Sequence, residues 1–209
     1  MLASSTWLFL RWLGWVVRRA RSVVARAAPI PCLLCRKTAN VTTDLTFTSP
    51  ARLDAPDSGP GPVSGAMLRW AAAVSTRTDL AELVSIHERS WIALPTAHDW
   101  DAWLIGWPAG SQTGWHDHQG SAGVLYVACG TLTEFSLPGG STSTDVRTRR
   151  IDATRGRAFG PNHIHHVVNE YDEPAYSIHI YAPRLRGMTR YAWQDDVLVS
   201  TGSEPAGRW

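Results

Sequence analysis

Cysteine is scarce in this sequence, with only Cys32, Cys35 and Cys129 among 209 residues. Three thiols cannot pair completely, and a disulfide framework needs an even and denser set. Cys32 and Cys35 have the C-x-x-C spacing of half a zinc site or of a redox pair, but no second C-x-x-C completes a tetrahedral structural zinc site. This cysteine usage predicts a cytoplasmic protein and leaves the role of the pair open.

The sequence also lacks a strong charge of either sign and a long hydrophobic run. Its formal net charge is +2, so the composition gives no reason to expect a nucleic-acid partner. Apolar residues gather at 7–17, but Arg11 interrupts them. A helix needs about 20 apolar residues to cross a bilayer, so this stretch is too short for a transmembrane helix.

Basic residues follow that stretch at Arg18, Arg19, Arg21 and Arg26. A cationic run without acidic residues is typical of an interfacial amphipathic helix or a targeting segment, although a signal peptide carries its positive charge before the apolar part. The alternatives are a poorly ordered extension, or a start site assigned too far upstream, with Met67 as an internal start. We favour the extension and keep membrane contact by this segment as the alternative.

The chain divides at a run rich in Pro, Gly, Ser and Asp over residues 48–65, which has too little apolar content to pack. We therefore predict an extension and linker over 1–65 and one folded domain over 66–209. From Met67 to His87 apolar residues recur at helical spacing, and Asp79 or Thr78 is placed to cap a second short helix. Later short apolar runs between Gly, Pro and Asn predict the strands of an antiparallel sandwich or barrel, at 103–107, 123–128, 131–137, 146–151, 157–159, 166–168 and 175–181.

The residues best suited to chemistry are histidines. In a strand, residues i and i+2 point to the same face, so His116 and His118 would project together into a barrel interior. A third imidazole, from the run His163-Ile-His165-His166 on a neighbouring strand, would complete one triangular face around a metal ion and leave positions open for substrate and oxygen. The spacing therefore predicts a three-histidine metal site.

The surroundings of these histidines resemble the two motifs of the cupin fold, G-x5-H-x-H-x(3,4)-E-x6-G and P-x-G-x2-H-x3-N. Gly123 stands where the first motif has Glu, and Gly160 and Asn162 stand where the second has Pro and Gly. The matching positions are Gly110, His116, His118, Gly130, His165 and Asn169. The resemblance implies an all-β dominated cupin fold, that is, a double-stranded β-helix or jelly-roll-like barrel, with short N-terminal helices.

Without the motif's Glu, the site has three neutral imidazoles and no anionic ligand, so an incoming thiolate would supply negative charge. Three-histidine iron is the arrangement of thiol dioxygenases, and residues 80–183 resemble the cysteine dioxygenase type I family, in its bacterial form. The resemblance is carried by W-H-D-H at 115–118, Ser-Ala-Gly at 121–123 and Ser177-Ile-His179-Ile-Tyr181.

The resemblance implies that the three histidines hold Fe(II), that a small thiol and O2 are the partners, and that a sulfinic acid is the product. Ser177, His179 and Tyr181 alternate along a strand, and in the family such a relay lies beside the iron, with the tyrosine as proton or hydrogen-bond donor. Arg89 lies within about a residue of the arginine with which the cysteine enzymes grip a substrate carboxylate, although an ordinary surface arginine is the alternative. Gly123 occupies the place of the cysteine that forms a thioether crosslink in some members, so we expect no crosslink.

The other histidines have their own predictions. His166 directly follows a ligand and should face away from the metal, whereas His163 shares the parity of His165 and is the rival ligand. His87 and His98 belong to no motif and are expected at the surface. Asp117 should face outward, where it could support the ligands from behind.

Two other interpretations stay open beside thiol dioxygenation by an iron(II) enzyme acting on cysteine or a related mercapto acid. One is a different metal-dependent cupin enzyme, and the other is a non-catalytic cupin that binds a ligand in its barrel, because fold alone does not fix function. An intact Ser-His-Tyr run argues against the non-catalytic alternative. The residues leave open which thiol is used and the oligomeric state.

Overall fold

The computed structural model describes residues 62–137 and 144–208. The predicted extension, most of the predicted linker, and Cys32 and Cys35 lie outside the described residues. Among the residues that are described, no helix is both long and apolar enough to cross a bilayer. The domain boundary at residue 65 and the cytoplasmic location stay predictions.

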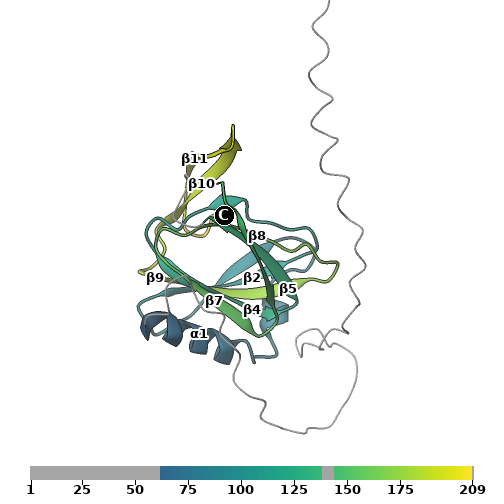
Figure 1. Ribbon diagram of the computed structural model, residues 1–209. Helices are drawn as coiled ribbons and strands as arrows, with labels where there is room; N and C mark the ends of the chain where they lie inside the picture. The colour runs from purple at the N-terminus through teal and green to yellow at the C-terminus, as the bar shows by residue number, and fades with distance from the viewer. Residues whose placement is uncertain (1–61, 138–143, 209) are drawn as a thin grey trace, which may run out of the picture. The chain divides into compact units, whose positions relative to one another are not determined.

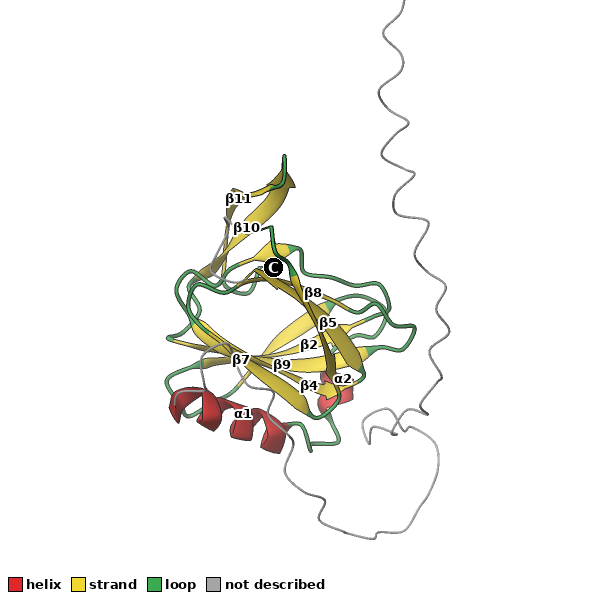
Figure 2. Cartoon of the chain, viewed as in Figure 1, coloured by secondary structure: helices red, strands yellow, loops and turns green. Residues whose placement is uncertain are grey.

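Strands dominate the described part of the chain, and two short helices precede them (Figure 2). The helices are α1 (Pro62–Val74) and α2 (Leu80–Leu83). The strands are β1 (Ser90–Leu94), β2 (Asp101–Trp107), β3 (Trp115–His116), β4 (Ala122–Cys129), β5 (Thr131–Leu137), β6 (Arg147–Asp152), β7 (Arg155–Phe159), β8 (Ile164–Val168), β9 (Ala175–Ala182), β10 (Gly187–Gln194) and β11 (Val197–Pro205).

The strands form two antiparallel sheets that enclose a barrel (Figure 1). One sheet has the order β1-β2-β9-β4-β7, and the other has the order β11-β10-β3-β8-β5-β6. The hairpin of β10 and β11 extends from one end of the barrel (Figure 1). This architecture confirms the predicted cupin fold with short N-terminal helices.

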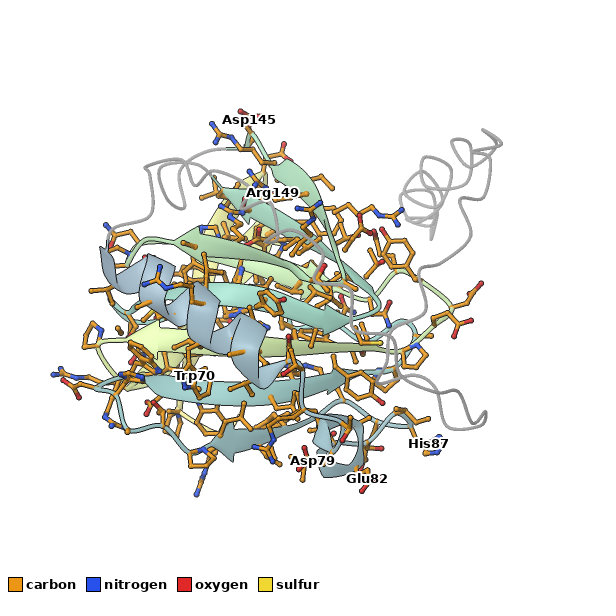
Figure 3. The ribbon with its side chains drawn as sticks, turned by 90° about the horizontal axis from the view of Figure 1, so that it is seen from below. Trp70, Asp79, Glu82, His87, Asp145 and Arg149 are labelled. Carbon is orange, nitrogen blue, oxygen red and sulfur yellow. The ribbon has the colours of Figure 1, made fainter. Side chains whose placement is uncertain are left out.

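The first sheet is buried on both faces. Alternate residues of β9, such as Ile178 and Ile180, point outward into a cluster with Met67 and Leu68 of α1, while the residues between them face the barrel interior. Figure 3 shows α1 lying across the outer face of this sheet, with Trp70 on the helix. Burying an aliphatic side chain of this size contributes about 1.5–3 kcal/mol, so α1 closes the outer face and leaves the inner face of β9 for polar residues.

Some elements differ from the predictions. The strand at 131–137 has the predicted bounds, but β1, β10 and β11 were not expected, and β3 ends at His116 so that His118 lies beyond the strand. Asp79 occupies the N-cap position of α2, yet its side chain makes no capping hydrogen bond and instead accepts from Arg77. The expectation that His116 and His118 lie on one strand is therefore wrong, although both side chains are buried.

Candidate metal centre and substrate pocket

Three buried imidazoles meet between the two sheets. His116 on β3 pairs directly with His165 on β8, and His118 follows β3 in the chain. One ring nitrogen from each of the three lies within 4.8 Å of the others. The Nε2 atoms of His116 and His165 are 3.1 Å apart, and all three side chains are at most 3% exposed. The structure thus brings together the three residues predicted as metal ligands.

The hydrogen bonds of two of these rings decide which nitrogen keeps its lone pair. Nδ1 of His116 contacts the carbonyl oxygen of Gly114 at 2.9 Å, and Nδ1 of His165 contacts a carboxylate oxygen of Glu134 at 2.9 Å. Both partners only accept, so each Nδ1 carries the hydrogen and each Nε2 keeps a lone pair in the neutral ring. Two lone pairs 3.1 Å apart repel each other unless a cation lies between them.

The third ring supplies a further sign of a missing partner. Neither ring nitrogen of His118 has a hydrogen-bond partner among the described residues, although the side chain is fully buried. Its ring stacks on Phe159, with centroids 4.8 Å apart, and lies 5.0 Å from the ring of Tyr181. Buried polar atoms without partners are costly. Metal–nitrogen bonds of about 2.1 Å at right angles place two nitrogens about 3.0 Å apart, so the donor set fits a metal ion.

Burial also keeps these rings neutral. Desolvation lowers the pKa of His116 and of His118 well below the ordinary value, and the neighbouring rings add to this effect. Desolvation likewise lowers the pKa of His165 well below 6.5, even though its hydrogen bond to Glu134 opposes the shift. Neutral imidazole is the form that binds a metal.

A buried carboxylate supports the centre from behind. Oε1 of Glu134 on β5 accepts from His165 and from Nε2 of His163, both at 2.9 Å, and its other oxygen forms an ion pair with Arg157 of β7. Burial by itself would raise the pKa of Glu134, but hydrogen bonds from the two histidines, helped by the charge of Arg157, hold it well below 4.5. Glu134 is therefore an anion one hydrogen bond away from a predicted ligand.

The predicted relay lies on β9 beside the three histidines. Nε2 of His179 contacts the hydroxyl of Ser177 at 2.9 Å, and Nδ1 of His179 contacts the hydroxyl of Tyr181 at 3.3 Å. The indole N–H of Trp107 donates to the oxygen of Ser177 at 2.8 Å. Desolvation lowers the pKa of His179 to about 3 and raises that of Tyr181. Both groups are thus neutral around pH 7.

The donors along this relay have a direction. Trp107 can only donate, so the oxygen of Ser177 accepts from it, and in the described residues His179 is the one other partner of that hydroxyl. The arrangement that gives the buried serine hydrogen an acceptor among the described residues directs it to Nε2 of His179, which places the ring hydrogen on Nδ1, facing Tyr181. The phenolic hydrogen of Tyr181 is then available to the pocket.

A small pocket opens beside His116 and Tyr181, lined by residues of β2 and β9 from one sheet and of β3 and β10 from the other. Its lining residues are Arg89, Ile105, Thr113, His116, His179, Tyr181, Met188 and Arg190. The pocket wall thus combines one predicted metal ligand, two members of the relay and two arginines, and it contains no carboxylate.

The two arginines differ in their partners. Arg190 donates from Nε and Nη2 to Glu204, at 3.0 and 2.7 Å, and from Nη1 to the carbonyl of Thr113. Nε of Arg89 is buried without a hydrogen-bond partner among the described residues, and the guanidinium lies 5.2 Å from the ring centroid of Trp107. Desolvation, assisted by the charge of Arg190, lowers the pKa of Arg89 to about 10. In the part of the chain that the structure describes, no carboxylate forms an ion pair with Arg89.

Gly123 stands opposite Tyr181 on one side and Phe159 on the other. A Cβ atom there would lie 2.6 Å from the Phe159 ring and 2.5 Å from the carbonyl oxygen of Ile180. The Phe159 ring therefore fills the space beside Gly123. In this chain an aromatic ring stands where a crosslinking side chain would need room.

The remaining predicted residues divide between support and surface. His163 contacts Glu134 and lies outside the three-histidine cluster, and His166 points the other way, between Trp115 and Phe135. His87 and His98 are exposed, and Figure 3 shows His87 at the edge of the molecule near α2. The carboxylate of Asp117 accepts from the backbone of Gln119 and Thr189 and from the hydroxyl of Tyr191, so it joins the ligand loop to β10.

The sequence matches the model of the family described as cysteine dioxygenase type I over residues 57–194. The chain belongs to this family. Membership agrees with the predicted resemblance and with a metal-dependent oxygenase built on a cupin barrel. No curated protein matches the chain in sequence.

Several solved structures are similar to part of this cysteine dioxygenase type I family member. The protein TT1209 from Thermus thermophilus has a TM-score of 0.43 and 20% identity, and the match covers 51% of this chain and 95% of that chain. An uncharacterized conserved protein with a double-stranded beta-helix domain from Klebsiella pneumoniae has a TM-score of 0.42 and 16% identity, over 56% and 90% of the two chains. A Cupin 2 conserved barrel domain protein from Salinispora arenicola has a TM-score of 0.37 and 16% identity, and the match covers 44% of this chain and 74% of that chain.

Sequence reasoning missed four residues of the site, namely Trp107, Glu134, Phe159 and Arg190. One signal was present for Glu134: it shares strand parity with the fully buried Leu132, so a charged residue occupied an inward position of β5. The others look like ordinary apolar or surface residues in the sequence and gain their roles only from the pairing of strands.

Proposed function

We propose that this protein is an iron(II)-dependent thiol dioxygenase that converts the thiol of a small mercapto acid, such as cysteine or 3-mercaptopropionate, to a sulfinic acid. Both atoms of O2 end on the sulfur, so the reaction needs no further co-substrate. Family membership supports the class of reaction. The observation that carries the proposal is the convergence of His116, Tyr181 and Arg89 on one pocket.

His116, His118 and His165 would hold the iron through ring nitrogens that burial keeps unprotonated. The iron, when bound, would supply a single ion on which thiol sulfur and dioxygen are brought together. The buried aromatic rings around His118 keep water away from that position.

Tyr181 would serve as the hydrogen-bond or proton donor of the site. Burial raises its pKa, so the phenol keeps its hydrogen, and the chain from Trp107 through Ser177 and His179 turns that hydrogen toward the pocket. The role of the relay is to hold one proton at the phenolic oxygen in a fixed direction.

Arg89 would bind the carboxylate of the substrate. It is a half-buried arginine whose Nε is buried without a partner among the described residues, and its guanidinium lies over the rings of Trp91 and Trp107. A carboxylate can pair with a guanidinium through two parallel hydrogen bonds. Arg190 is already paired with Glu204, so Arg89 is the stronger candidate.

The test measures sulfinate formation and O2 consumption by the iron-loaded protein with cysteine and with 3-mercaptopropionate. We expect one sulfinate per O2, and loss of both signals in His118→Ala. A protein that binds iron through these histidines but oxidises neither thiol would refute thiol dioxygenation and favour another metal-dependent cupin enzyme.

Arg89 is tested by pairing two variants with two substrates. Arg89→Ala should lower kcat/KM for 3-mercaptopropionate about 10- to 100-fold, as expected for a hydrogen bond to a charged group worth about 1.5–3 kcal/mol. The same variant should leave 2-mercaptoethanol, which has no carboxylate, nearly unchanged. Arg184→Ala is the matched control, because Arg184 is an exposed arginine paired with Asp101 outside the pocket. Equal losses on both thiols would contradict carboxylate binding by Arg89.

A further inference from the structure

The three predicted ligands are held in three different ways. Behind His116 is a neutral backbone carbonyl, behind His118 there is no hydrogen-bond partner among the described residues, and behind His165 is the carboxylate of Glu134. Of the three ligands, only His165 is therefore hydrogen-bonded to an anion among the described residues. Hydrogen bonding to a carboxylate raises the basicity of an imidazole and fixes its orientation.

The carboxylate is built for this position. Glu134 is fully buried, and both of its oxygens are occupied, one by two imidazoles and one by the guanidinium of Arg157. Burying an isolated carboxylate destabilises the folded state, so the charge of Glu134 requires a buried arginine and a second histidine as partners. An apolar residue at this inward position of β5 would need no such hydrogen-bond and ion-pair partners.

Glu134, His163 and His165 also form a compact group that by itself could hold a metal ion. The guanidinium of Arg157 lies against the same carboxylate and would repel a second cation there. The group is better explained as support for the three-histidine centre.

We propose that Glu134 is the positioning residue of the metal centre, supplying through His165 the negative charge that the three neutral ligands lack, with Arg157 setting how much of that charge reaches the metal. The ligand set contains no anion, because Gly123 stands where cupin motifs carry Glu. The anion lies instead one hydrogen bond farther out. This inference rests on the proposed metal centre but not on the proposed thiol oxidation.

The proposal predicts opposite effects for the two partners of the ion pair. Removing the carboxylate weakens metal binding, because His165 loses both its anchor and its anionic partner. Removing the guanidinium leaves the carboxylate hydrogen-bonded to His163 and His165 and takes away the cation that offsets its charge. Metal binding should then stay as tight as in the wild type or become tighter.

The test uses the full chain without metal and measures its affinity for Zn(II) by competition with a chromophoric chelator. Glu134→Gln should bind Zn(II) about 10- to 100-fold more weakly, the range seen when such a supporting partner is lost. Arg157→Gln should bind at least as tightly as the wild type. Glu134→Gln alone removes the carboxylate that pairs with the buried Arg157 and could therefore fail to fold. The double variant Glu134→Gln/Arg157→Gln removes both charges of this ion pair and tests the proposal in that case. It should show the weakened affinity of Glu134→Gln.

A second readout separates charge from mere packing. In the iron-loaded protein, the reduction potential should rise in the double variant, since an anion near the metal favours the oxidised ion, and it should fall or stay constant in Arg157→Gln. Wild-type affinity in the double variant, or equal weakening by Arg157→Gln, would overturn the proposal. Neither readout requires thiol oxidation, so the proposed function can fail while this inference stands.

Discussion

Four buried histidines should make the stability of the metal-free protein strongly dependent on pH. Desolvation lowers the pKa of His116, His118, His165 and His179 below the ordinary 6.5. Below pH 6.5 the unfolded chain therefore binds protons that the folded chain does not. Because the stability changes with pH in proportion to this difference in bound protons, acidification destabilises the folded state.

The size of the effect follows from the unfolded state. A histidine with an ordinary pKa that stays neutral when folded costs about 2 kcal/mol when the pH falls from 7 to 5. Four such residues cost roughly 8 kcal/mol, which is comparable to the whole stability of a typical domain, about 5–15 kcal/mol. Glu134 does not contribute between pH 7 and 5, because its lowered pKa affects stability only below about pH 4.5.

Urea unfolding of the metal-free protein at pH 7, 6 and 5 measures this dependence. His118→Phe is the informative variant, because His118 has no hydrogen bond to lose and its ring already stacks on Phe159. The variant should lose about a quarter of the pH dependence, close to 2 kcal/mol between pH 7 and 5. Equal stabilities at pH 7 and 5, or an unchanged dependence in His118→Phe, would refute the reasoning.

Two further predictions concern the neighbours of the centre. Gly123→Cys should destabilise the protein by about 1–3 kcal/mol in thermal melts, because its Cβ would overlap Phe159 and the Ile180 carbonyl. Adding Phe159→Ala should restore part of the loss, and no recovery would show that the ring is not the obstacle. Tyr181→Phe should lower kcat by about 100-fold or more with little change in Zn(II) affinity, measured by steady-state O2 uptake and chelator competition, if the phenol donates a proton in the reaction. A kcat within threefold of the wild type would contradict a donor role for Tyr181.

The strands that were predictable are those whose two faces differ in polarity or whose ends carry turn residues. Residues 131–137 lie between Gly130 and Pro-Gly-Gly, so turn residues mark both ends, and the predicted bounds are those of β5. β11 gives a weaker signal because most of it is exposed: Val197 and Val199 lie on the surface, and Leu198 is its one buried residue. The prediction that His116 and His118 share one strand was wrong because the strand ends at His116, where Asp117 accepts hydrogen bonds from Gln119 and Thr189.

The site shows the same division. His116, His118 and His165 could be predicted because the chemistry of a metal site restricts residue type and spacing together. Arg89 was uncertain because a position before a strand does not fix where a long side chain ends. The pairing of β1 with β2 brings it to Trp107 and the pocket. No pattern within a single strand could show that Trp107 would contact both Arg89 and Ser177.

The H-x-H motif suggests two equivalent ligands, but the structure makes them unequal. His116 is fixed by a hydrogen bond to Gly114 and by the strand pairing of β3 with β8. His118 lies beyond the strand, and its ring is packed against Phe159 and Tyr181 without a hydrogen bond among the described residues. Its two unpartnered nitrogens make the metal-free state the costly one at this position. Metal binding should therefore order His118 more than His116, so the gain in stability on adding metal depends chiefly on the ligand that the fold itself holds least.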